Sequence, residues 1–518
     1  MIPSLEINEQ FQKAIDLLKN TDKHLFITGK AGSGKSTFLE HFIKKNFQEI
    51  IVLAPTGVAA VNIKGETIHS FFKFRPHITV EEAESLGRRF VKSKIFKAIK
   101  TIVIDEVSMV RADLLDCVNT FLCKARQNKK PFGGVRMIFI GDLYQLPPVV
   151  RKDEKEAMQS KYKSPYFFDS YVIKNLLSET EEPQIAYVEF EKIYRQTNLE
   201  FIELLNCVRN RSVTPKHLEK LNSRCKENIS DIMDGYIYLT TINKQADEIN
   251  LVNIEKLTTK AYYYEAEISG GFGESYYPSD KKLALKVGAR IMFLNNDSLR
   301  RWINGTVGTI VQLTTENICV QLSNREIVEV EPYEWIIYKT LYNKNNKSIE
   351  KEEIGSFIQF PLMLAWAITI HKSQGKTFDK AIIDIGRGVF AHGQVYVALS
   401  RCRSLEGIIL KTPIKKGHIL MDWCIVKFLT SFQYQLAEKN MSIEGKINLL
   451  KDAIDKNKNL EIVYLKSKDE KSKRIVKPIK VEKMEYKGYK FLGVKAYCFS
   501  KKENRVFRVD RILEANLM

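Results

Sequence analysis

Cysteine is scarce in this sequence, with eight residues among 518, and no two of them form a CxxC pair. No cluster of Cys and His has the spacing of a zinc site. Scattered single cysteines are typical of reduced core residues in a cytosolic-type compartment. This pattern excludes a fold that is organised around zinc.

Segments that direct a chain to a membrane are also lacking. The first residues, MIPSLEINEQ, have no basic stretch followed by an apolar run, so no signal peptide is predicted. No apolar stretch approaches the ~20 residues that span a bilayer. We expect no membrane partner and a cytoplasmic location of bacterial type.

Acidic residues are outnumbered: 62 Asp and Glu stand against 81 Lys and Arg, which gives a formal net charge of +19. A surplus of this size indicates a polyanionic partner or an anionic surface. A lysine-rich surface that only keeps the protein soluble is the alternative. Residues 441–518 hold 20 basic and 11 acidic residues, which predicts a basic C-terminal appendage.

Four short apolar runs without alternation predict strands that are buried on both faces of a parallel sheet. The runs are HLFITG (24–29), IIVLAP (50–55), TIVIDE (101–106) and VRMIFIGD (135–142). With helix-period segments between them, they predict a doubly wound α/β domain over residues 1–183, with a helical insertion at about 72–100. Ligands of such sheets bind at the C-terminal ends of the strands.

A second α/β domain is predicted over residues 184–435. Its candidate strands are YIYLTT (236–241), AIIDIG (381–386) and GIILKT (407–412). Between them, residues 286–355 alternate apolar and polar side chains and contain Asn/Gly turns, which predicts a small inserted antiparallel barrel. The polar segment 342–353 is expected to be a loop or a hairpin tip.

The strongest single motif is GKAGSGKS, which fits GxxxxGK[ST] after a strand and before a helix. Small residues let backbone N–H groups wrap phosphates, and the helix N-terminus adds a positive dipole. Lys35 is expected to reach the β- and γ-phosphates and Ser36 to ligate Mg²⁺. The residues expected to bind nucleotide are Gly29, Ala31, Gly32, Ser33, Gly34, Lys35, Ser36 and Thr37.

Polar side chains follow two of the predicted strands. Asp105 and Glu106 are suited to hold a metal ion and to position or activate water, although solvation of the strand end is the alternative for such a pair. Gln145 follows the fourth strand, where its amide can sense a γ-phosphate. Shaping of the turn before two prolines is the alternative for Gln145.

Eight motifs in this order match a known family. They are GKAGSGKS (29–36), APTGVAA (54–60), TIHSFF (67–72), IDEVSM (104–109), GDLYQLPPV (141–149), YRQ (194–196), WAITIHKSQGKT (366–377) and YVALSRCRS (396–404). Over roughly residues 5–415 the chain resembles the Pif (petite integration frequency) DNA helicases, which are RecD-like enzymes of superfamily 1B.

The resemblance implies two RecA-like domains with ATP and Mg²⁺ between them, and 5′→3′ movement on single-stranded DNA. Forked duplex DNA and structured DNA such as guanine quadruplexes are the expected substrates, in DNA repair, recombination, or telomere or replication maintenance. We expect a monomer, with a dimer on DNA as the alternative. The resemblance assigns Asp105 to magnesium with Ser36, Glu106 to water activation and Gln145 to the γ-phosphate, beside Lys35.

Two arginines of the second domain, Arg195 and Arg401, are implied to reach the γ-phosphate. An arginine delivered by domain closure contributes ~10³–10⁵ in rate and ties hydrolysis to domain position. Without the family context, each would be interpreted as a surface or DNA-binding arginine. Gly375 is implied to contact nucleotide, and either Gln10 or Gln12 to recognise adenine, of which we favour Gln10.

Tracking along a single strand needs phosphate donors and stacking surfaces. The residues implied to contact DNA are Pro55, Thr56, Thr67, His69, Phe71, Thr369, His371, Lys372 and Ser373. The two histidines could instead be structural, and Phe71, Phe72 and Phe74 are more often core residues. The helical insertion resembles the strand-separating wedge of the family, and the barrel resembles its SH3-like module.

Residues 441–518 resemble a WYL domain, a small β-rich fold. The matching features are IVYL with Tyr464, Pro478, the YKFLGVKAYC strand and RVFRVDRI, whereas Val463 replaces the usual tryptophan. An additional basic contact with DNA or nucleotide is expected, and a solvated stabilising domain is the alternative.

Two other functions compete with a helicase. A P-loop phosphotransferase or simple NTPase would explain the glycine loop and Asp105 but not Arg401 or the basic surplus. A nucleic-acid-binding regulator without unwinding activity would not need Glu106 or the two arginines.

Overall fold

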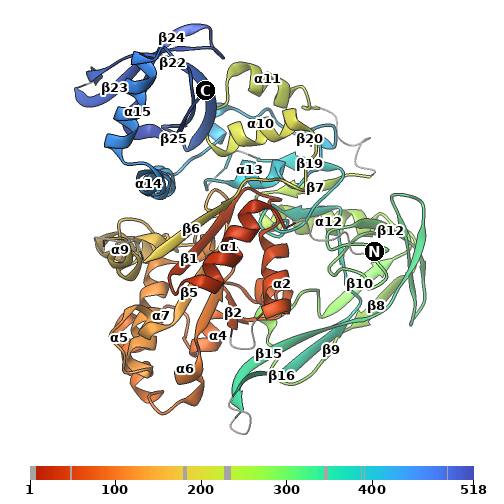
Figure 1. Cartoon of the computed structure of the whole chain (residues 1–518). Helices are drawn as coiled ribbons and strands as arrows, with labels where there is room; N and C mark the ends of the chain where they lie inside the picture. Colours follow the sequence, from red (N-terminus) through yellow and green to blue (C-terminus); the bar gives the residue numbers. More distant parts are fainter. Residues whose placement is uncertain are drawn as a thin grey trace. The chain divides into compact units, whose positions relative to one another are not determined.

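The computed structural model describes residues 7–46, 50–178, 184–226, 235–343, 348–386, 388–389, 391–486 and 488–518 (Figure 1). It divides into two compact units. Unit 1 comprises Met1–Arg209 and Val213–Leu420, and unit 2 comprises Asn210–Ser212 and Met421–Met518. Each unit is described by itself.

The first half of unit 1 is built on a parallel sheet with the strand order β3-β2-β4-β5-β1-β6. The strands are β1 (His24–Gly29), β2 (Ile50–Ala54), β3 (Glu66–Thr67), β4 (Thr101–Ile104), β5 (Arg136–Ile140) and β6 (Ile185–Phe190). The four predicted strands are confirmed. Strand β6 pairs with β1, so the predicted boundary at residue 183 lies one strand before the end of this sheet.

Helices cover both faces of this sheet, which explains why its strands are continuously apolar. On one face, Phe11 of α1 (Glu9–Asn20) and Phe38 of α2 (Lys35–Asn46) pack against Phe190, with ring centroids 4.5 and 5.3 Å from it. On the other face, Phe26 of β1 meets Phe167 at 5.5 Å. Other helices of this half are α3 (Gly57–Asn62), α7 (Ala112–Ala125), α8 (Lys155–Lys161) and α9 (Tyr171–Ser178).

The predicted helical insertion contains α5 (Val80–Arg89) and α6 (Lys94–Ala98), and follows α4 (Ile68–Phe72). An aromatic cluster attaches it to α7: Phe72 stands 5.3 Å from Phe121 and Phe96 4.8 Å from Phe121. Phe71 belongs to the same cluster, 5.6 Å from Phe96, and is only 5% exposed. The Phe71 ring therefore packs in this core, and its contact with DNA stays a prediction.

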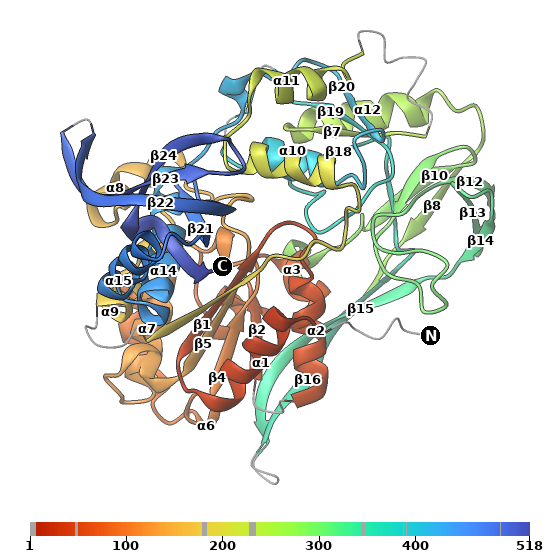
Figure 2. The same cartoon turned by 45° about the horizontal axis from the view of Figure 1, so that its top comes forward.

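The second half of unit 1 is built on a smaller parallel sheet with the order β18-β7-β19-β20. Its strands are β7 (Ile237–Thr240), β18 (Ala367–Thr369), β19 (Ala381–Asp384) and β20 (Ile408–Leu410), of which β18 was not predicted. Its helices are α10 (Leu199–Arg209), α11 (Pro215–Asn222), α12 (Asn243–Glu255) and α13 (Gln394–Leu399). Two parallel sheets with helices confirm the predicted RecA-like class (Figures 1 and 2).

The β-rich insertion is longer than predicted and extends from β8 to β17. Its strands are β8 (Ala261–Glu265), β9 (Glu267–Ile268), β10 (Lys282–Lys286), β11 (Arg290–Phe293), β12 (Val307–Leu313), β13 (Ile318–Leu322), β14 (Ile327–Val330), β15 (Tyr333–Asn343), β16 (Ser348–Gln359) and β17 (Leu362–Leu364). One apolar core joins residues from Tyr264 to Leu362, so β8 and β10 belong with the predicted barrel strands. Strands β15 and β16 form a long hairpin, whose tip at 344–347 lies outside the described residues.

Unit 2 contains α14 (Trp423–Asn440), α15 (Ile443–Asp455) and an antiparallel sheet with the order β24-β23-β22-β21-β25. The strands are β21 (Leu460–Lys466), β22 (Glu470–Tyr486), β23 (Tyr489–Cys498), β24 (Glu503–Arg508) and β25 (Ile512–Leu517). One face of the sheet packs on Leu450 and Ala453 of α15. The unit begins at Met421, before the predicted start at 441, because α14 also packs on this sheet through Ala437.

Within the described ranges, no helix is both long enough and apolar enough to cross a bilayer.

Candidate nucleotide-binding site

The glycine loop connects β1 to α2, and its backbone needs glycine at two positions. Gly32 and Gly34 have φ angles of 80° and 86°, in the left-handed region that disfavours other residues. A Cβ atom on Gly32 would also stand 2.5 Å from the Cβ atom of Arg195, which comes from the other side of the site. The loop therefore combines a phosphate-binding conformation with close approach of Arg195.

Lys35 is the first residue of α2, and its ammonium group lies inside the loop. Nζ donates to the carbonyl oxygens of Gly29 at 2.7 Å and Lys30 at 3.1 Å. Burial lowers the pKa of Lys35, while nearby Asp142 and Glu106 act in the opposite direction. The position fits a cation that neutralises phosphate charge.

Two carboxyl groups follow β4. Asp105 is 9% exposed, and burial raises its pKa. Glu106 has a left-handed backbone with φ of 50°, which is costly for a residue other than glycine. Burial and the neighbouring charge of Asp105 raise the pKa of Glu106 to about 7, close to the value at which a carboxylate serves as a general base.

Gln145 follows β5 in a buried polar cluster. Its Nε2 atom donates to Oδ2 of Asp142 at 3.3 Å, and Asp142 forms an ion pair with Arg209 at 3.5 Å. The Arg209 guanidinium lies 3.9 Å from the ring centroid of Tyr144. Gln145 is thus fixed at its nitrogen, which leaves its oxygen to face the site.

The second half of unit 1 contributes both predicted arginines. Arg195 donates Nη1 to the carbonyl oxygen of Ser400 at 3.2 Å. Arg401 is 1% exposed and donates Nε to the carbonyl oxygen of Val397 at 2.9 Å. Burial first, and then the charge of Arg195, lower the pKa of Arg401. Two cations held this close together are suited to a polyanionic ligand.

Two further residues of the second half reach the first half, and sequence reasoning did not select them. Tyr396 of α13 accepts a hydrogen bond from the backbone N–H of Ala31 at 2.9 Å. Gln374 donates Nε2 to Oε2 of Glu106 at 3.1 Å and to Oε1 of Gln145 at 3.3 Å. Both lie inside motifs that carried the family resemblance, which was the available signal.

These groups surround one cavity of about 790 Å³. The lining residues are Phe11, Ala31, Gly32, Ser33, Gly34, Lys35, Ser36, Thr37, Glu106, Gln145, Tyr194, Arg195, Gly375, Thr377, Arg401 and Arg403. Its size is within the range of small-molecule sites. Most predicted nucleotide-binding residues are therefore brought together, with phosphate-binding groups from one half and arginines from the other.

Both glutamines that were predicted to recognise adenine form hydrogen bonds with other protein groups. The Gln10 side chain accepts from the backbone N–H of Glu191 at 3.4 Å, and Gln12 donates to Asp16 at 2.8 Å. Neither is among the residues that line the cavity. The choice between Gln10 and Gln12 stays a prediction.

Comparison with known proteins gives a consistent result. A family model described as PIF1-like helicase matches residues 5–218, and a WYL domain model matches residues 445–517. The ATP-dependent DNA helicase Pif1 of Bdellovibrio bacteriovorus is 32% identical over 440 residues, which cover 83% of this chain and 93% of that protein.

Solved structures agree with this match. The crystal structure of Bacteroides sp Pif1 in complex with ADP-AlF4 is 39% identical, with a TM-score of 0.74, over 83% of this chain and 97% of that one. The structure of Pif1 helicase from Bacteroides in complex with ADP-AlF3 and ssDNA is 39% identical, with a TM-score of 0.56, over 82% and 97%.

The chain belongs to the PIF1-like helicase family. It also carries a C-terminal WYL domain, so both predicted resemblances are confirmed.

The DNA contacts expected of a PIF1-like chain can be placed for the first half. Pro55 and Thr56 follow β2, and Thr56 is exposed at the start of α3. Thr67 is 9% exposed, and its hydroxyl lies 3.2 Å from that of Tyr276 in the β-rich insertion. Thr56 is thus the more accessible of the two threonines.

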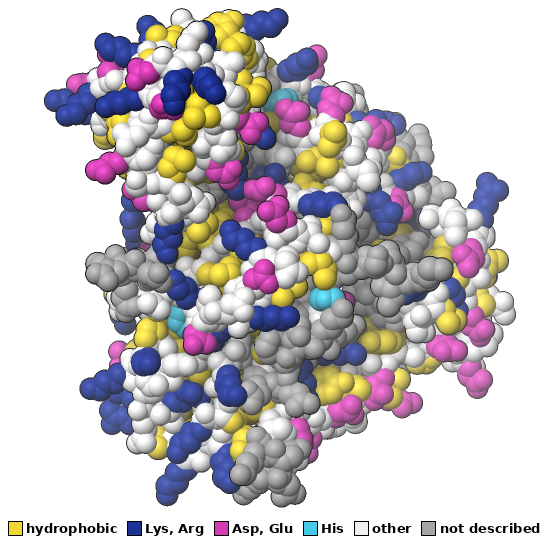
Figure 3. Space-filling view, in the orientation of Figure 1, with side chains coloured by type: hydrophobic (Ala, Val, Ile, Leu, Met, Phe, Trp, Pro, Cys, Tyr) yellow, Lys and Arg dark blue, Asp and Glu magenta, His cyan; other side chains and the backbone are white. Residues whose placement is uncertain are grey.

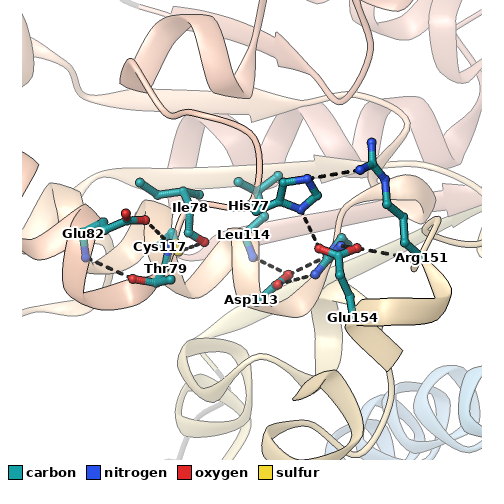
Figure 4. A network of polar contacts seen from close by, with 10 residues as sticks. His77, Ile78, Thr79, Glu82, Asp113, Leu114, Cys117, Arg151 and Glu154 are labelled. Atoms are coloured by element: carbon teal, nitrogen blue, oxygen red, sulfur yellow. Dashed lines mark hydrogen bonds and ion pairs between the residues drawn. The ribbon is translucent and has the colours of Figure 1, made fainter. Parts of the chain in front are cut away.

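His69 lies near a polar network at the base of the helical insertion. Glu154 accepts from Nη1 of Arg111 at 2.8 Å and lies 2.7 Å from Nδ1 of His77, whose other ring nitrogen is 3.4 Å from Arg151 (Figure 4). Burial first, and then the charge of Arg111, lower the pKa of His69. Both effects disfavour the charged form of the His69 ring.

In the second half, the predicted DNA contacts divide into two pairs. Thr369 and Ser373 are 3% and 0% exposed, and the Ser373 hydroxyl donates to the carbonyl oxygen of Ile370 at 2.7 Å. The Thr369 hydroxyl accepts from the backbone N–H of Lys372 at 3.3 Å, so both side chains complete the turn after β18, and their contacts with DNA stay predictions. His371 is half-buried and Lys372 is exposed, so these two remain candidates.

The surface charge is spread over the molecule. On the face shown in Figure 3, Lys and Arg side chains are interspersed with acidic ones. Unit 2 carries many exposed basic side chains on β22 to β24, namely Lys471, Lys473, Lys480, Lys483, Lys490, Lys495, Lys501, Lys502 and Arg505. This set accounts for the basic appendage that the composition predicted.

Proposed function

We propose that this chain is an ATP-driven helicase that moves 5′→3′ on single-stranded DNA and unwinds duplex or structured DNA at forks. The observation that carries the proposal is the cavity, in which Lys35 and Glu106 of one half face Arg195 and Arg401 of the other. A site divided in this way changes when the halves move, which couples hydrolysis to motion. We infer action on DNA at the nucleoid in the cytoplasm, by a monomer.

In this proposal, the two halves of unit 1 contribute different groups to the binding and hydrolysis of ATP. The glycine loop and Lys35 hold the phosphates of ATP, while Tyr194, which is exposed, gives the cavity an aromatic surface on which a base can lie. Glu106 accepts a proton from the attacking water. Arg195 and Arg401 neutralise charge that develops on the γ-phosphoryl group.

Magnesium fits the donor set of this site. The described residues contain no group of three acidic, His or Cys ligands, and Mg²⁺ in such sites takes only one or two protein oxygens besides phosphate and water. The Ser36 hydroxyl and the Asp105 carboxylate would hold the ion. Burial raises the pKa of Asp105, and a cation beside the carboxyl group would act in the opposite direction by stabilising its charged form. Bound Mg²⁺ supplies charge neutralisation at the β- and γ-phosphates.

The deciding experiment measures ATP hydrolysis with and without single-stranded DNA, together with unwinding of duplexes that carry a 5′ or a 3′ tail. We expect strong stimulation by DNA and unwinding only from the 5′ tail. A rate of ATP hydrolysis that does not change when single-stranded DNA is added would support a simple NTPase. DNA binding without hydrolysis would support a regulator.

For the WYL domain we propose an additional contact with DNA, supported by the exposed basic side chains of β22 to β24. Deletion of residues 421–518, which removes α14 together with the sheet on which it packs, should leave a working ATPase with weaker DNA affinity and a smaller salt dependence of binding, because fewer phosphates are neutralised. An unchanged salt dependence would contradict this contact and leave a stabilising role.

A further inference from the structure

Gln374 lies in the segment that follows β18, and its side chain crosses from the second half of unit 1 to the first. Its Nε2 atom is 3.1 Å from Oε2 of Glu106 and 3.3 Å from Oε1 of Gln145. An amide nitrogen carries two N–H donors, so it can serve both acceptors at once. Gln374 thus links the carboxylate proposed to activate water with the amide proposed to sense the γ-phosphate.

The surroundings of Glu106 and Gln145 allow the two hydrogen bonds from Gln374 to fix the orientation of both side chains. The nitrogen of Gln145 is already committed to Asp142, which turns its oxygen towards Gln374. Glu106 has a strained left-handed backbone, which persists only where neighbouring groups hold it. A donor from the opposite half is therefore well placed to set the direction of the Glu106 carboxylate.

The chain around Gln374 connects the link to the proposed DNA track. The backbone N–H of Gln374 donates to the carbonyl oxygen of His371 at 3.1 Å, and Lys372 between them is exposed. Two residues after Gln374, Nζ of Lys376 donates to Oδ1 of Asn304 in the β-rich insertion at 2.7 Å. Displacement of this tight turn by a DNA strand would move Gln374 with it.

We propose that Gln374 is a positioning residue through which DNA bound at the turn after β18 aligns Glu106 and Gln145 for hydrolysis. The inference rests on the proposed function, since it assigns the coupling between DNA and ATP to one side chain. It does not require Gln374 to touch either ligand.

The test compares Gln374→Ala with Gln374→Met in the full chain. Methionine keeps the length and volume of the side chain but has no N–H donor, so it restores packing and not hydrogen bonding. With saturating single-stranded DNA, we expect kcat for ATP hydrolysis to fall about 10- to 100-fold in both variants. The KM for ATP and the Kd for single-stranded DNA should stay within about threefold, because the proposed role is alignment and not binding.

Gln312→Ala, at an exposed position of β12, is the matched control and should behave as the unaltered chain. Methionine that restores kcat would overturn the proposal in favour of packing, and so would a loss confined to KM or to DNA affinity. Failure of the proposed function gives a different result: the unaltered chain itself would then show no stimulation by DNA, and the inference would fall with it.

Discussion

The two halves of the nucleotide-binding cavity are built on the same kind of parallel sheet but contribute to it differently. The first half provides a continuous segment, Gly29–Thr37, which contains the glycine loop and the start of α2 and which we propose binds the phosphates, and acids directly after one strand. The second half provides single side chains from separate segments, namely Arg195, Gln374, Tyr396 and Arg401. We infer that binding of the nucleotide depends on local backbone geometry. Control of its hydrolysis would instead depend on contacts that form between the two halves of unit 1.

The largest effect should come from Lys35 in the first half. Lys35→Ala removes the cation that we propose binds the β- and γ-phosphates, so ATP hydrolysis should fall at least about a thousandfold and unwinding should be lost. Binding of single-stranded DNA, measured by fluorescence anisotropy, should stay within about threefold. The control is Lys19→Ala on exposed α1. Unwinding by the Lys35 variant would remove the nucleotide assignment.

Arg401 tests whether the second half matters as much as the first. Lysine cannot reproduce the planar guanidinium, which donates to Val397 and to the Ser400 hydroxyl at 3.0 Å while it lines the cavity. Arg401→Lys should lower kcat about 100- to 1000-fold with little change in ATP binding.

Arg88→Lys, on the exposed face of α5, is the matched replacement and should change nothing. A thermal melt shows whether the Arg401 variant is folded. A folded variant with normal kcat would mean that Arg401 only supports the second half, and the comparison between the halves would fail.

The same difference between local backbone geometry and contacts between distant residues explains which features could be predicted from the sequence. HLFITG predicted β1 with its exact bounds because a run buried on both faces determines its own surroundings. Gly32 and Gly34 were recognisable because a phosphate loop needs their positive φ. Gln374 could not be found in this way, since Glu106 is 268 positions away in the chain and only the fold brings them together.

The errors have related physical causes. Strand β6 lies after the predicted boundary because a parallel partner can be distant in sequence. The β-rich insertion began earlier than expected because β8, AYYYE, joins its core through Tyr264.

Tyr396 offers a smaller and more specific test of contact between the halves. Tyr396→Phe removes the acceptor for the Ala31 N–H, so the glycine loop loses support from α13 without loss of volume. A hydrogen bond of this kind is worth about 1 kcal/mol, so the KM for ATP should rise about fivefold with kcat nearly unchanged. An unchanged KM would show that the loop holds its conformation without help from the second half.

The smallest effect should come from Glu154, whose partners Arg111 and His77 all lie in the first half. Burial alone would raise the pKa of Glu154, but the hydrogen bonds from Arg111 and His77 outweigh it and lower the pKa to about 2. A depressed carboxyl pKa stabilises the fold above the unfolded value of 4.5, and this contribution is lost as pH falls towards 2. Glu154→Gln should therefore lower the melting temperature by about 2 °C at pH 7, and the difference between this variant and the unaltered chain should narrow steadily below pH 4.5.

Glu316→Gln, at an exposed turn, is the control and should show no such pH-dependent difference. In both variants kcat should be normal, because neither residue lines the cavity. A difference that persisted unchanged to pH 3, or a loss of kcat, would place this network within the coupling between the halves rather than in the stability of the first half alone.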